Sequence, residues 1–79
     1  MDPVIIYTDY HCPYSLMAKS YLDKKGVDYH EYNLSHHPLI KKNLFSHFGE
    51  IGTPLIIVGE EAFIGFDREG LEEALIRSS

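Results

Sequence analysis

The sequence predicts one α/β domain over residues 1–79, in which a four-stranded mixed sheet is flanked by helices in the order βαβαββα. Two apolar runs of strand length, residues 4–7 and 55–58, indicate the centre of the sheet. Three other stretches repeat apolar residues at steps of three and four, the spacing of one helix face. The strand–helix–strand start implies a parallel pair with a right-handed crossover, and the tight turn at Gly59-Glu60 implies an antiparallel hairpin.

Proline and glycine mark the first strand and the first helix. Pro3 precedes the run Val4-Ile5-Ile6-Tyr7, which is typical of a buried central strand. A helix is expected from Pro13 to Lys25, because proline suits the first helical turn and Gly26 suits the stop. Apolar residues at helical spacing predict its inward face: Tyr14, Met17, Ala18, Tyr21 and Leu22.

The middle of the chain is predicted to add a strand and a second helix. Residues 28–34 alternate weakly between apolar and polar and predict the strand. The helix is expected to begin between Ser35 and Pro38 and to end before Gly49. Its apolar stripe consists of Leu39, Ile40, Leu44, Phe45 and Phe48.

The last third of the sequence predicts a hairpin and a third helix. Residues 62–64 form the antiparallel mate of strand 55–58. Asp67 is the expected N-cap of the helix, and Phe66 and Leu71 stand at the two ends of a hydrophobic staple. The inward helix face consists of Leu71, Ala74 and Leu75. No apolar strip remains for the surface once these core positions are assigned, and we expect a monomer.

Composition and charge exclude several classes of protein. The 79 residues are 44% hydrophobic and carry a net charge of −5, with dispersed basic residues, which argues against binding to nucleic acid or to an anionic membrane. One cysteine forms no internal disulfide, so a disulfide-stapled secreted scaffold is excluded. We find neither a signal peptide nor an apolar run of membrane-spanning length, and we expect a cytoplasmic protein.

Cys12 stands where the first strand leads into the first helix, in Tyr10-His11-Cys12-Pro13-Tyr14-Ser15. Backbone N–H groups and the positive end of the helix dipole stabilise a thiolate there, so a lowered pKa is expected at Cys12. Ser15 takes the place of the second cysteine of a C-x-x-C pair. Its hydroxyl either donates a hydrogen bond to the thiolate or is satisfied by backbone. Tyr14 either walls the approach to the sulfur or packs inward, and packing is favoured.

The segment Cys12-Pro13-Tyr14-Ser15 resembles the active-site tetrapeptide of glutaredoxins in its single-cysteine form. Gly26-Val27-Asp28-Tyr29 leading to Asn33-Leu34 is similar to the second strand of that family. Thr53-Pro54-Leu55-Ile56-Ile57-Val58 resembles its proline-preceded third strand, and Gly65-Phe66-Asp67 resembles the motif that opens its last helix. The motifs follow family order across residues 4–76. The resemblance implies the thioredoxin-like (glutaredoxin) fold and thiol–disulfide oxidoreductase activity.

The resemblance also implies a substrate site around the cysteine. Pro54 is expected to follow a cis peptide bond, which leaves the backbone of Thr53 free to pair with a bound disulfide. Asp67 is expected to help hold the amino end of glutathione beside its capping role, with Phe66 next to it in the binding site. Glutathione is the implied co-substrate, and no tightly bound cofactor is expected.

Three positions depart from the family pattern. Asp9 stands where glutaredoxins commonly carry a lysine, and it would disfavour an anionic tripeptide if it pointed into the site. Gly52-Thr53-Pro54 replaces the common Thr-Val-Pro, and Gly65-Phe66 replaces a Gly-Gly pair. We therefore expect glutathione or another low-molecular-weight thiol as co-substrate, and thiol-containing proteins as partners through mixed disulfides.

The histidines are interpreted as surface residues. His11 precedes the thiol and aids the thiolate if it is protonated, but an exposed loop residue is the favoured interpretation. No ligand spacing organises His30, His36, His37 and His47, so no metal site is expected.

The sequence thus predicts a glutaredoxin-like oxidoreductase that uses one cysteine in a monothiol mechanism, with two alternatives. One is an iron–sulfur carrier in which two chains each contribute Cys12 and external thiols complete the ligands. Pro13 disfavours it, because carriers usually have Gly-Phe after the cysteine. The other is a non-catalytic binding module, which Asp9 and Phe66 favour and which predicts an ordinary Cys12 pKa of about 8.5.

Overall fold

The computed structural model describes residues 3–9, 12–49 and 53–78, which follow the predicted order βαβαββα. The helices and strands have these bounds: β1 (Val4–Thr8), α1 (Pro13–Lys24), β2 (His30–Asn33), α2 (Pro38–Phe48), β3 (Leu55–Val58), β4 (Glu61–Ile64) and α3 (Arg68–Ser78). None of the helices in this described part of the chain has the length and apolar character needed to cross a membrane.

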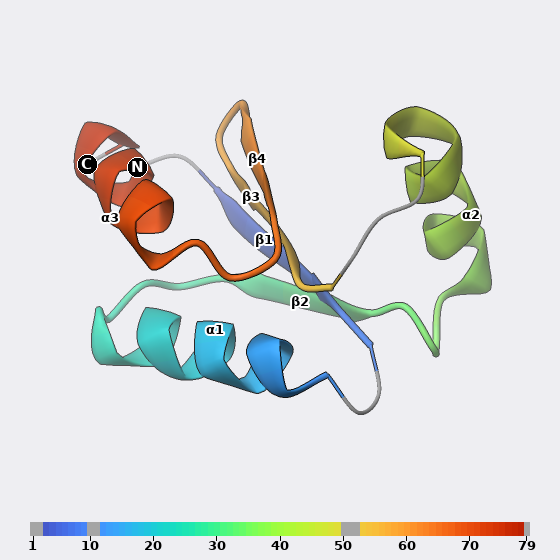
Figure 1. Ribbon diagram of the computed structural model, residues 1–79, viewed down its shortest axis with the longest axis horizontal. Helices are drawn as coiled ribbons and strands as arrows, with labels where there is room; N and C mark the ends of the chain where they lie inside the picture. Colours follow the sequence, from blue (N-terminus) through green and yellow to red (C-terminus); the bar gives the residue numbers. More distant parts are fainter. Residues whose placement is uncertain (1–2, 10–11, 50–52, 79) are drawn as a thin grey trace.

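The sheet has the strand order β2-β1-β3-β4 and is mixed, as predicted. β1 runs parallel to β2 and antiparallel to β3, and β3 runs antiparallel to β4. Strand β1 lies inside the sheet because it pairs with β2 on one edge and β3 on the other, and its alternate side chains Val4, Ile6 and Thr8 are all buried. Figure 1 shows α1 and α3 on one side of the sheet and α2 on the other. The fold is therefore a sheet with a helical layer on each face.

Two apolar clusters hold these layers together. The larger one joins α1 and α3 to β1 and β3 through Ile6, Leu22, Ile56 and Leu71, each 0% exposed. The smaller one lies under α2 and is centred on Leu34, Leu44 and Leu55. Partly buried apolar residues complete it: Tyr7, Ile40 and Phe48.

Two of the predicted helix boundaries have clear local causes. Helix α1 ends at Lys24, one residue earlier than predicted, and Gly26 follows with a φ of +69°. There the Val27 N–H bonds to the Leu22 carbonyl and the Gly26 N–H bonds to the Asp23 carbonyl, which is the Schellman arrangement. The Asp67 carboxylate caps α3 as predicted, since its Oδ1 accepts a hydrogen bond of 3.0 Å from the Gly70 N–H.

The strand boundaries differ from the predictions by one or two residues. β2 begins at His30 rather than at residue 28, because it lies at the sheet edge and pairs only with residues 5–8 of β1. β4 begins at Glu61 rather than at residue 62, because Glu61 pairs with Val58 across the hairpin.

The predicted inward face of α1 is partly wrong. Tyr14 and Met17 are 58% and 51% exposed, whereas Ser15 and Ala18 are buried. The residues of these turns that face the core are thus the small side chains of Ser15 and Ala18. The larger residues are therefore left on its flank, and an apolar strip remains on the surface that the sequence analysis did not expect.

The predicted apolar stripe of α2 is wider than the face that packs. Leu44 is the buried residue of this helix, and Ile40 and Phe48, one turn to either side, are partly buried. Leu39 and Phe45 lie outside that row and are 76% and 59% exposed. Helix α2 thus contacts the sheet along a single row of side chains.

Candidate active site

Cys12 is the N-cap residue of α1, as the sequence predicts. Its φ of −101° and ψ of 101° are extended, and Pro13 takes the first helical position. The Ser15 N–H donates a hydrogen bond of 3.1 Å to the Cys12 carbonyl, which closes the first turn. The sulfur therefore lies at the end of the helix where N–H groups are unsatisfied and the dipole is positive. Tyr10 and His11, which precede it in the motif, lie outside the described residues.

The Thr53-Pro54 segment lies directly against this sulfur. The peptide bond between the two residues is cis, as the family resemblance implies. The Cys12 thiol donates a hydrogen bond of 3.2 Å to the Thr53 carbonyl oxygen. Pro54 is buried, and its carbonyl accepts a hydrogen bond of 2.7 Å from the Gly65 N–H at the end of β4. The hairpin therefore fixes the backbone that faces the nucleophile.

Hydrogen bonding lowers the pKa of Cys12. Burial alone would raise the pKa of the thiol, but hydrogen bonds from the Ser15 and Thr53 side chains and from the backbone of Ser15 and Tyr14 outweigh it. The net result is a pKa below the ordinary value for cysteine, which increases the thiolate fraction at neutral pH.

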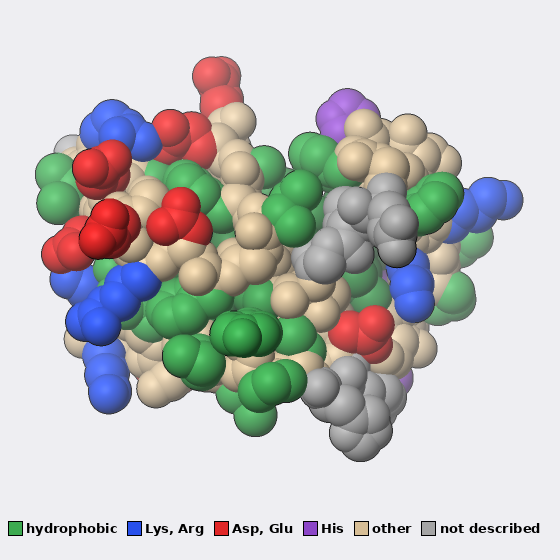
Figure 2. All heavy atoms as spheres, in the orientation of Figure 1, with side chains coloured by type: hydrophobic (Ala, Val, Ile, Leu, Met, Phe, Trp, Pro, Cys, Tyr) green, Lys and Arg blue, Asp and Glu red, His purple; other side chains and the backbone are tan. Residues whose placement is uncertain are grey.

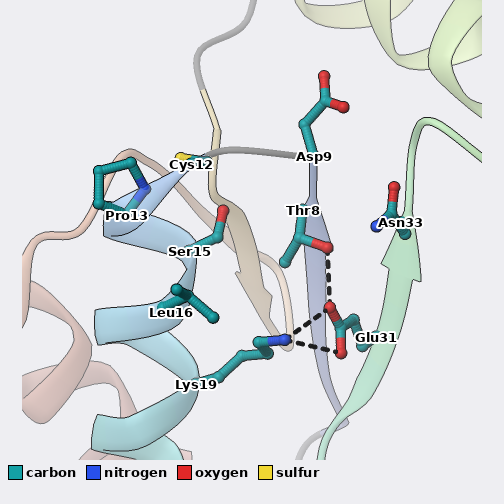
Figure 3. Close-up of a pocket in the computed structure, with 9 residues that line it drawn as sticks. All are labelled: Thr8, Asp9, Cys12, Pro13, Ser15, Leu16, Lys19, Glu31 and Asn33. Atoms are coloured by element: carbon teal, nitrogen blue, oxygen red, sulfur yellow. Dashed lines mark hydrogen bonds and ion pairs between the residues drawn. The ribbon is translucent and has the colours of Figure 1, made fainter.

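The Ser15 hydroxyl is placed to act on the thiolate. Its side chain is 3% exposed, and Oγ has no hydrogen-bond partner among the described residues while Cys12 is a thiol. The alternative in which backbone satisfies the hydroxyl is thus not observed in this part of the chain. Figure 3 shows Ser15 below the Cys12 sulfur on the same face of α1. When Cys12 loses its proton, this hydroxyl is available to donate a hydrogen bond to the sulfur.

A pocket of about 470 Å³ opens beside Cys12 between α1 and the ends of β1 and β2. Glu31 crosses its floor: it accepts a hydrogen bond of 2.8 Å from Thr8 Oγ1 and pairs with Lys19 Nζ at 3.1 Å (Figure 3). Sequence reasoning missed these three residues. Lys19 lies one turn after Ser15 and was detectable by helical spacing, whereas Glu31 reaches the pocket only through the strand register.

Asp9 lines the same pocket, but its carboxylate is engaged by the α2 side of the molecule. It accepts a hydrogen bond from Ser35 Oγ and lies 3.9 Å from Lys41 Nζ. In Figure 3 the side chain projects toward α2 and not toward the Cys12 sulfur. The expected repulsion of an anionic substrate is therefore reduced by geometry and by a neighbouring cation.

The other predicted substrate residues lie on the α3 side of the cysteine. Asp67 is exposed at the N-terminus of α3, and Phe66 packs edge to face with Tyr21 at a centroid distance of 5.8 Å. Tyr14 is exposed on the first turn of α1, so the favoured interpretation of inward packing was wrong. Among the described residues, neither Asp67 nor Phe66 is hydrogen-bonded to Cys12.

The described residues contain no group of three or more His, Cys, Asp or Glu side chains that could hold a metal ion. The histidines that the sequence analysis considered are dispersed: His30 lies on β2, His36 and His37 precede α2, and His47 lies in its last turn.

Comparison with known proteins places this arrangement in a family. The family model described as Glutaredoxin matches residues 4–64. A glutaredoxin from Pseudomonas aeruginosa is 39% identical over 67 residues, which cover 85% of this chain and 80% of the relative. Both the strand that carries the cis proline and the cysteine motif fall within the matched region.

Solved structures support the fold. The glutaredoxin-like protein NrdH-redoxin from Escherichia coli superposes with a TM-score of 0.83 at 22% identity, covering 90% of this chain and 92% of that protein. A buckwheat glutaredoxin–glutathione complex superposes with a TM-score of 0.78 at 19% identity, covering 98% and 76%. With the family match, these findings show that the chain belongs to the glutaredoxin family of thiol–disulfide oxidoreductases.

Proposed function

We propose that this protein reduces mixed disulfides between glutathione and other thiols by a monothiol mechanism. One observation carries the proposal: the only cysteine occupies the N-cap position of helix α1, and its thiol, which has a lowered pKa, lies 3.2 Å from the Thr53 carbonyl oxygen. A binding module without catalytic function predicts an ordinary Cys12 pKa, so this observation favours the oxidoreductase.

The first step is attack of the Cys12 thiolate on the glutathione sulfur of a mixed disulfide. The new Cys12–glutathione disulfide forms as the substrate disulfide breaks, and the substrate leaves as a thiolate that takes up a proton. A second glutathione thiolate then attacks the glutathione sulfur on Cys12. Glutathione disulfide leaves and the Cys12 thiolate is regenerated. Each cycle therefore consumes one free glutathione, and the glutathione released from the substrate forms the other half of the glutathione disulfide.

Ser15 gives this mechanism its single-thiol character. A cysteine at this position would attack the Cys12 mixed disulfide from within the chain, whereas a hydroxyl cannot. The buried Ser15 Oγ instead stabilises the attacking and leaving thiolate by hydrogen bonding. Deprotonation also removes the donor of the Cys12–Thr53 hydrogen bond, which releases the Thr53 carbonyl for strand-like pairing with the substrate backbone.

Glutathione is the proposed co-substrate because oppositely charged groups lie on the two sides of Cys12. On the α2 side Lys41, which is 61% exposed at its side chain, offers a cation to a glycine carboxylate. On the α3 side the exposed Asp67 carboxylate offers an anion to the glutamyl ammonium group. A glutaredoxin of the same fold has been solved in complex with glutathione. Thiol chemistry of this kind requires a reducing compartment, so we place the protein in the cytoplasm. We also propose that it acts as a monomer.

The test is turnover of the mixed disulfide of cysteine and glutathione in the presence of excess glutathione. Native protein is expected to turn it over, and Cys12→Ser is expected to be inactive. Mass spectrometry of the native protein after exposure to glutathione disulfide should show one glutathione adduct on Cys12. Turnover that survives in Cys12→Ser would overturn the proposal.

A further inference from the structure

An unpartnered apolar surface begins immediately after the nucleophile. Tyr14, Leu16 and Met17, on the first two turns of α1, are 58%, 65% and 51% exposed. Figure 2 shows apolar side chains gathered over α1, in the lower centre of that face. Leu16 also lines the pocket beside Cys12, so this apolar surface is continuous with the active site.

The surface leads into a groove of about 430 Å³ between α1 and the start of α3. Met17 and Phe66 give it apolar walls, and Tyr21 lines it from α1. The Tyr21 side chain is 8% exposed, and its buried hydroxyl has no hydrogen-bond partner in the described part of the chain. Buried hydroxyl groups are nearly always hydrogen-bonded, so this one is free to donate to an acceptor on a ligand bound in the groove.

The rim of the groove is positive although the chain as a whole carries a net charge of −5. Lys24 and Arg68 line the groove, and neither forms an ion pair with a carboxylate among the described residues. Arg68 instead lies with its guanidinium 5.8 Å from the centre of the Tyr21 ring. Other cations of this helical layer are already matched: Lys19 pairs with Glu31, and Lys25 pairs with Glu72.

We propose that this groove, lined by Leu16, Met17, Tyr21, Lys24, Phe66 and Arg68, binds a protein substrate through an apolar side chain and a carboxylate near its reactive cysteine. The inference rests on the proposed function and names the class of protein substrate. The apolar side chain lies against Met17 and Leu16, and the carboxylate lies between Lys24 and Arg68 within reach of the Tyr21 hydroxyl. Twelve residues of helix extend about 18 Å, so the carboxylate lies within about six extended residues of the substrate cysteine.

The test measures binding without catalysis, using ¹⁵N-labelled Cys12→Ser protein and two synthetic peptides that differ only in charge. Both carry serine in place of the reactive cysteine, followed by leucine and phenylalanine, and end in three glutamates or three lysines. The acidic peptide is expected to bind at least tenfold more tightly and to shift the amide signals of Met17 and Phe66. Because the protein is itself acidic, non-specific attraction predicts the opposite preference.

Two pairs of matched variants locate the site. Lys24→Glu is expected to weaken binding of the acidic peptide at least tenfold. Lys42→Glu, the same charge change on α2, is expected to change that affinity by less than twofold. Met17→Ser is expected to weaken binding of both peptides, whereas substitution of Leu39, an exposed apolar residue on α2, by serine is expected to weaken binding of neither. Equal affinity for the two peptides, no binding of either at millimolar concentration, or equal effects of Lys24→Glu and Lys42→Glu would overturn the inference.

A separate measurement keeps this inference apart from the proposed function. Turnover of the cysteine–glutathione disulfide by otherwise native Lys24→Glu protein is expected to equal that of the native protein, because Lys24 lies at the opposite end of α1 from Cys12, about 18 Å away and beyond the reach of that small substrate. If the native protein shows no turnover, the proposed function is wrong. The peptide affinities would still decide whether the groove binds an acidic segment.

Discussion

The two faces of the sheet are covered by helices in very different ways. On one face α1 and α3 share a core with β1 and β3 that includes five residues with no exposed surface: Ile6, Ala18, Leu22, Ile56 and Leu71. On the other face α2 rests on a small cluster through one row of side chains and leaves Leu39 and Phe45 exposed. The comparison indicates that tight packing is concentrated on the face that positions the nucleophile. That face carries Cys12 and Ser15, whereas the face under α2 contributes only charged side chains near the site.

Core truncations on the two faces are expected to show the largest contrast. Leu22→Ala, under α1, is expected to lower the free energy of unfolding by about 3–5 kcal/mol, because it opens a cavity where nothing is exposed. Leu44→Ala, under α2, is expected to cost about 2 kcal/mol, because Leu44 is 9% exposed and its cluster can collapse. Urea denaturation measures both, and equal losses at unchanged m-value would contradict the comparison.

Within the well-packed face, Ser15→Ala separates reactivity from stability. We expect the variant to raise the pKa of Cys12 toward its ordinary value, because the thiolate loses a hydrogen bond. A hydrogen bond to a charged group is worth about 1.5–3 kcal/mol, so the acid dissociation constant of the Cys12 thiol should fall about tenfold or more. Stability should change little, since the hydroxyl has no partner among the described residues in the thiol form.

The control for that variant is Ser20→Ala, an exposed serine on the same helix. Iodoacetamide alkylation as a function of pH should give the native midpoint for Ser20→Ala and a higher one for Ser15→Ala. An unchanged midpoint in Ser15→Ala would show that the serine hydroxyl does not stabilise the thiolate.

The start of α3 offers a third contrast, between helix propensity and capping. Alanine in place of a helical glycine ordinarily stabilises by about 1 kcal/mol. At Gly70, however, an added Cβ would meet Asp67 Oδ2 and would lie 2.9 Å from Phe63 Cε1. Gly70→Ala is therefore expected to disturb the cap and to lower the melting temperature. Asp67→Ala is expected to do the same, because it removes the capping hydrogen bond and lowers the free energy of unfolding by about 1 kcal/mol.

Thermal unfolding of the single and double variants checks this reasoning. Because both substitutions act on one cap, the loss in the double variant should be smaller than the sum of the two single losses. If Gly70→Ala proves more stable than the native protein, the effect of the substitution is set by helix propensity and not by contact with the Asp67 cap.

The smallest expected effect lies on the α2 face. Lys41→Ala is expected to raise the KM for glutathione about twofold to threefold, because Asp9 loses a neighbouring cation at 3.9 Å and exposed pairs contribute about 0.2–1 kcal/mol. Lys42→Ala, its neighbour on the same helix, serves as the control and should leave KM unchanged. An effect of equal size in both would indicate general electrostatics and not the Asp9 pair.

Local patterns in the sequence predicted the element order, the mixed sheet and the Asp67 cap. These features depend on residues close together in the chain, such as the apolar run of β3 or the spacing from Asp67 to Gly70. The exposure of Tyr14 and Met17 was not predictable in that way. Periodicity identifies an apolar arc of a helix, but tertiary packing decides which part of that arc faces the core, and here it buries the small Ser15 and Ala18 side chains.

The residues of the candidate site also differ in whether the sequence predicts them. The resemblance led directly to Cys12 and Thr53-Pro54, and the structure places them in contact although they are 41 residues apart. Glu31 on the pocket floor and the groove beside Tyr21 arise from strand register and helix packing, which have no local sequence signal. Tertiary contacts therefore determine which residues can distinguish one substrate from another.

The central claim is that Cys12 at the start of α1 is an activated nucleophile that accepts glutathione. The most direct measurement is the pH dependence of Cys12 alkylation, with and without prior exposure to glutathione disulfide. The account predicts an alkylation rate that reaches its plateau at a lower pH than for an ordinary cysteine, and complete protection by one glutathione adduct. Alkylation that titrates at the ordinary cysteine pKa and is not blocked by glutathione disulfide would contradict it.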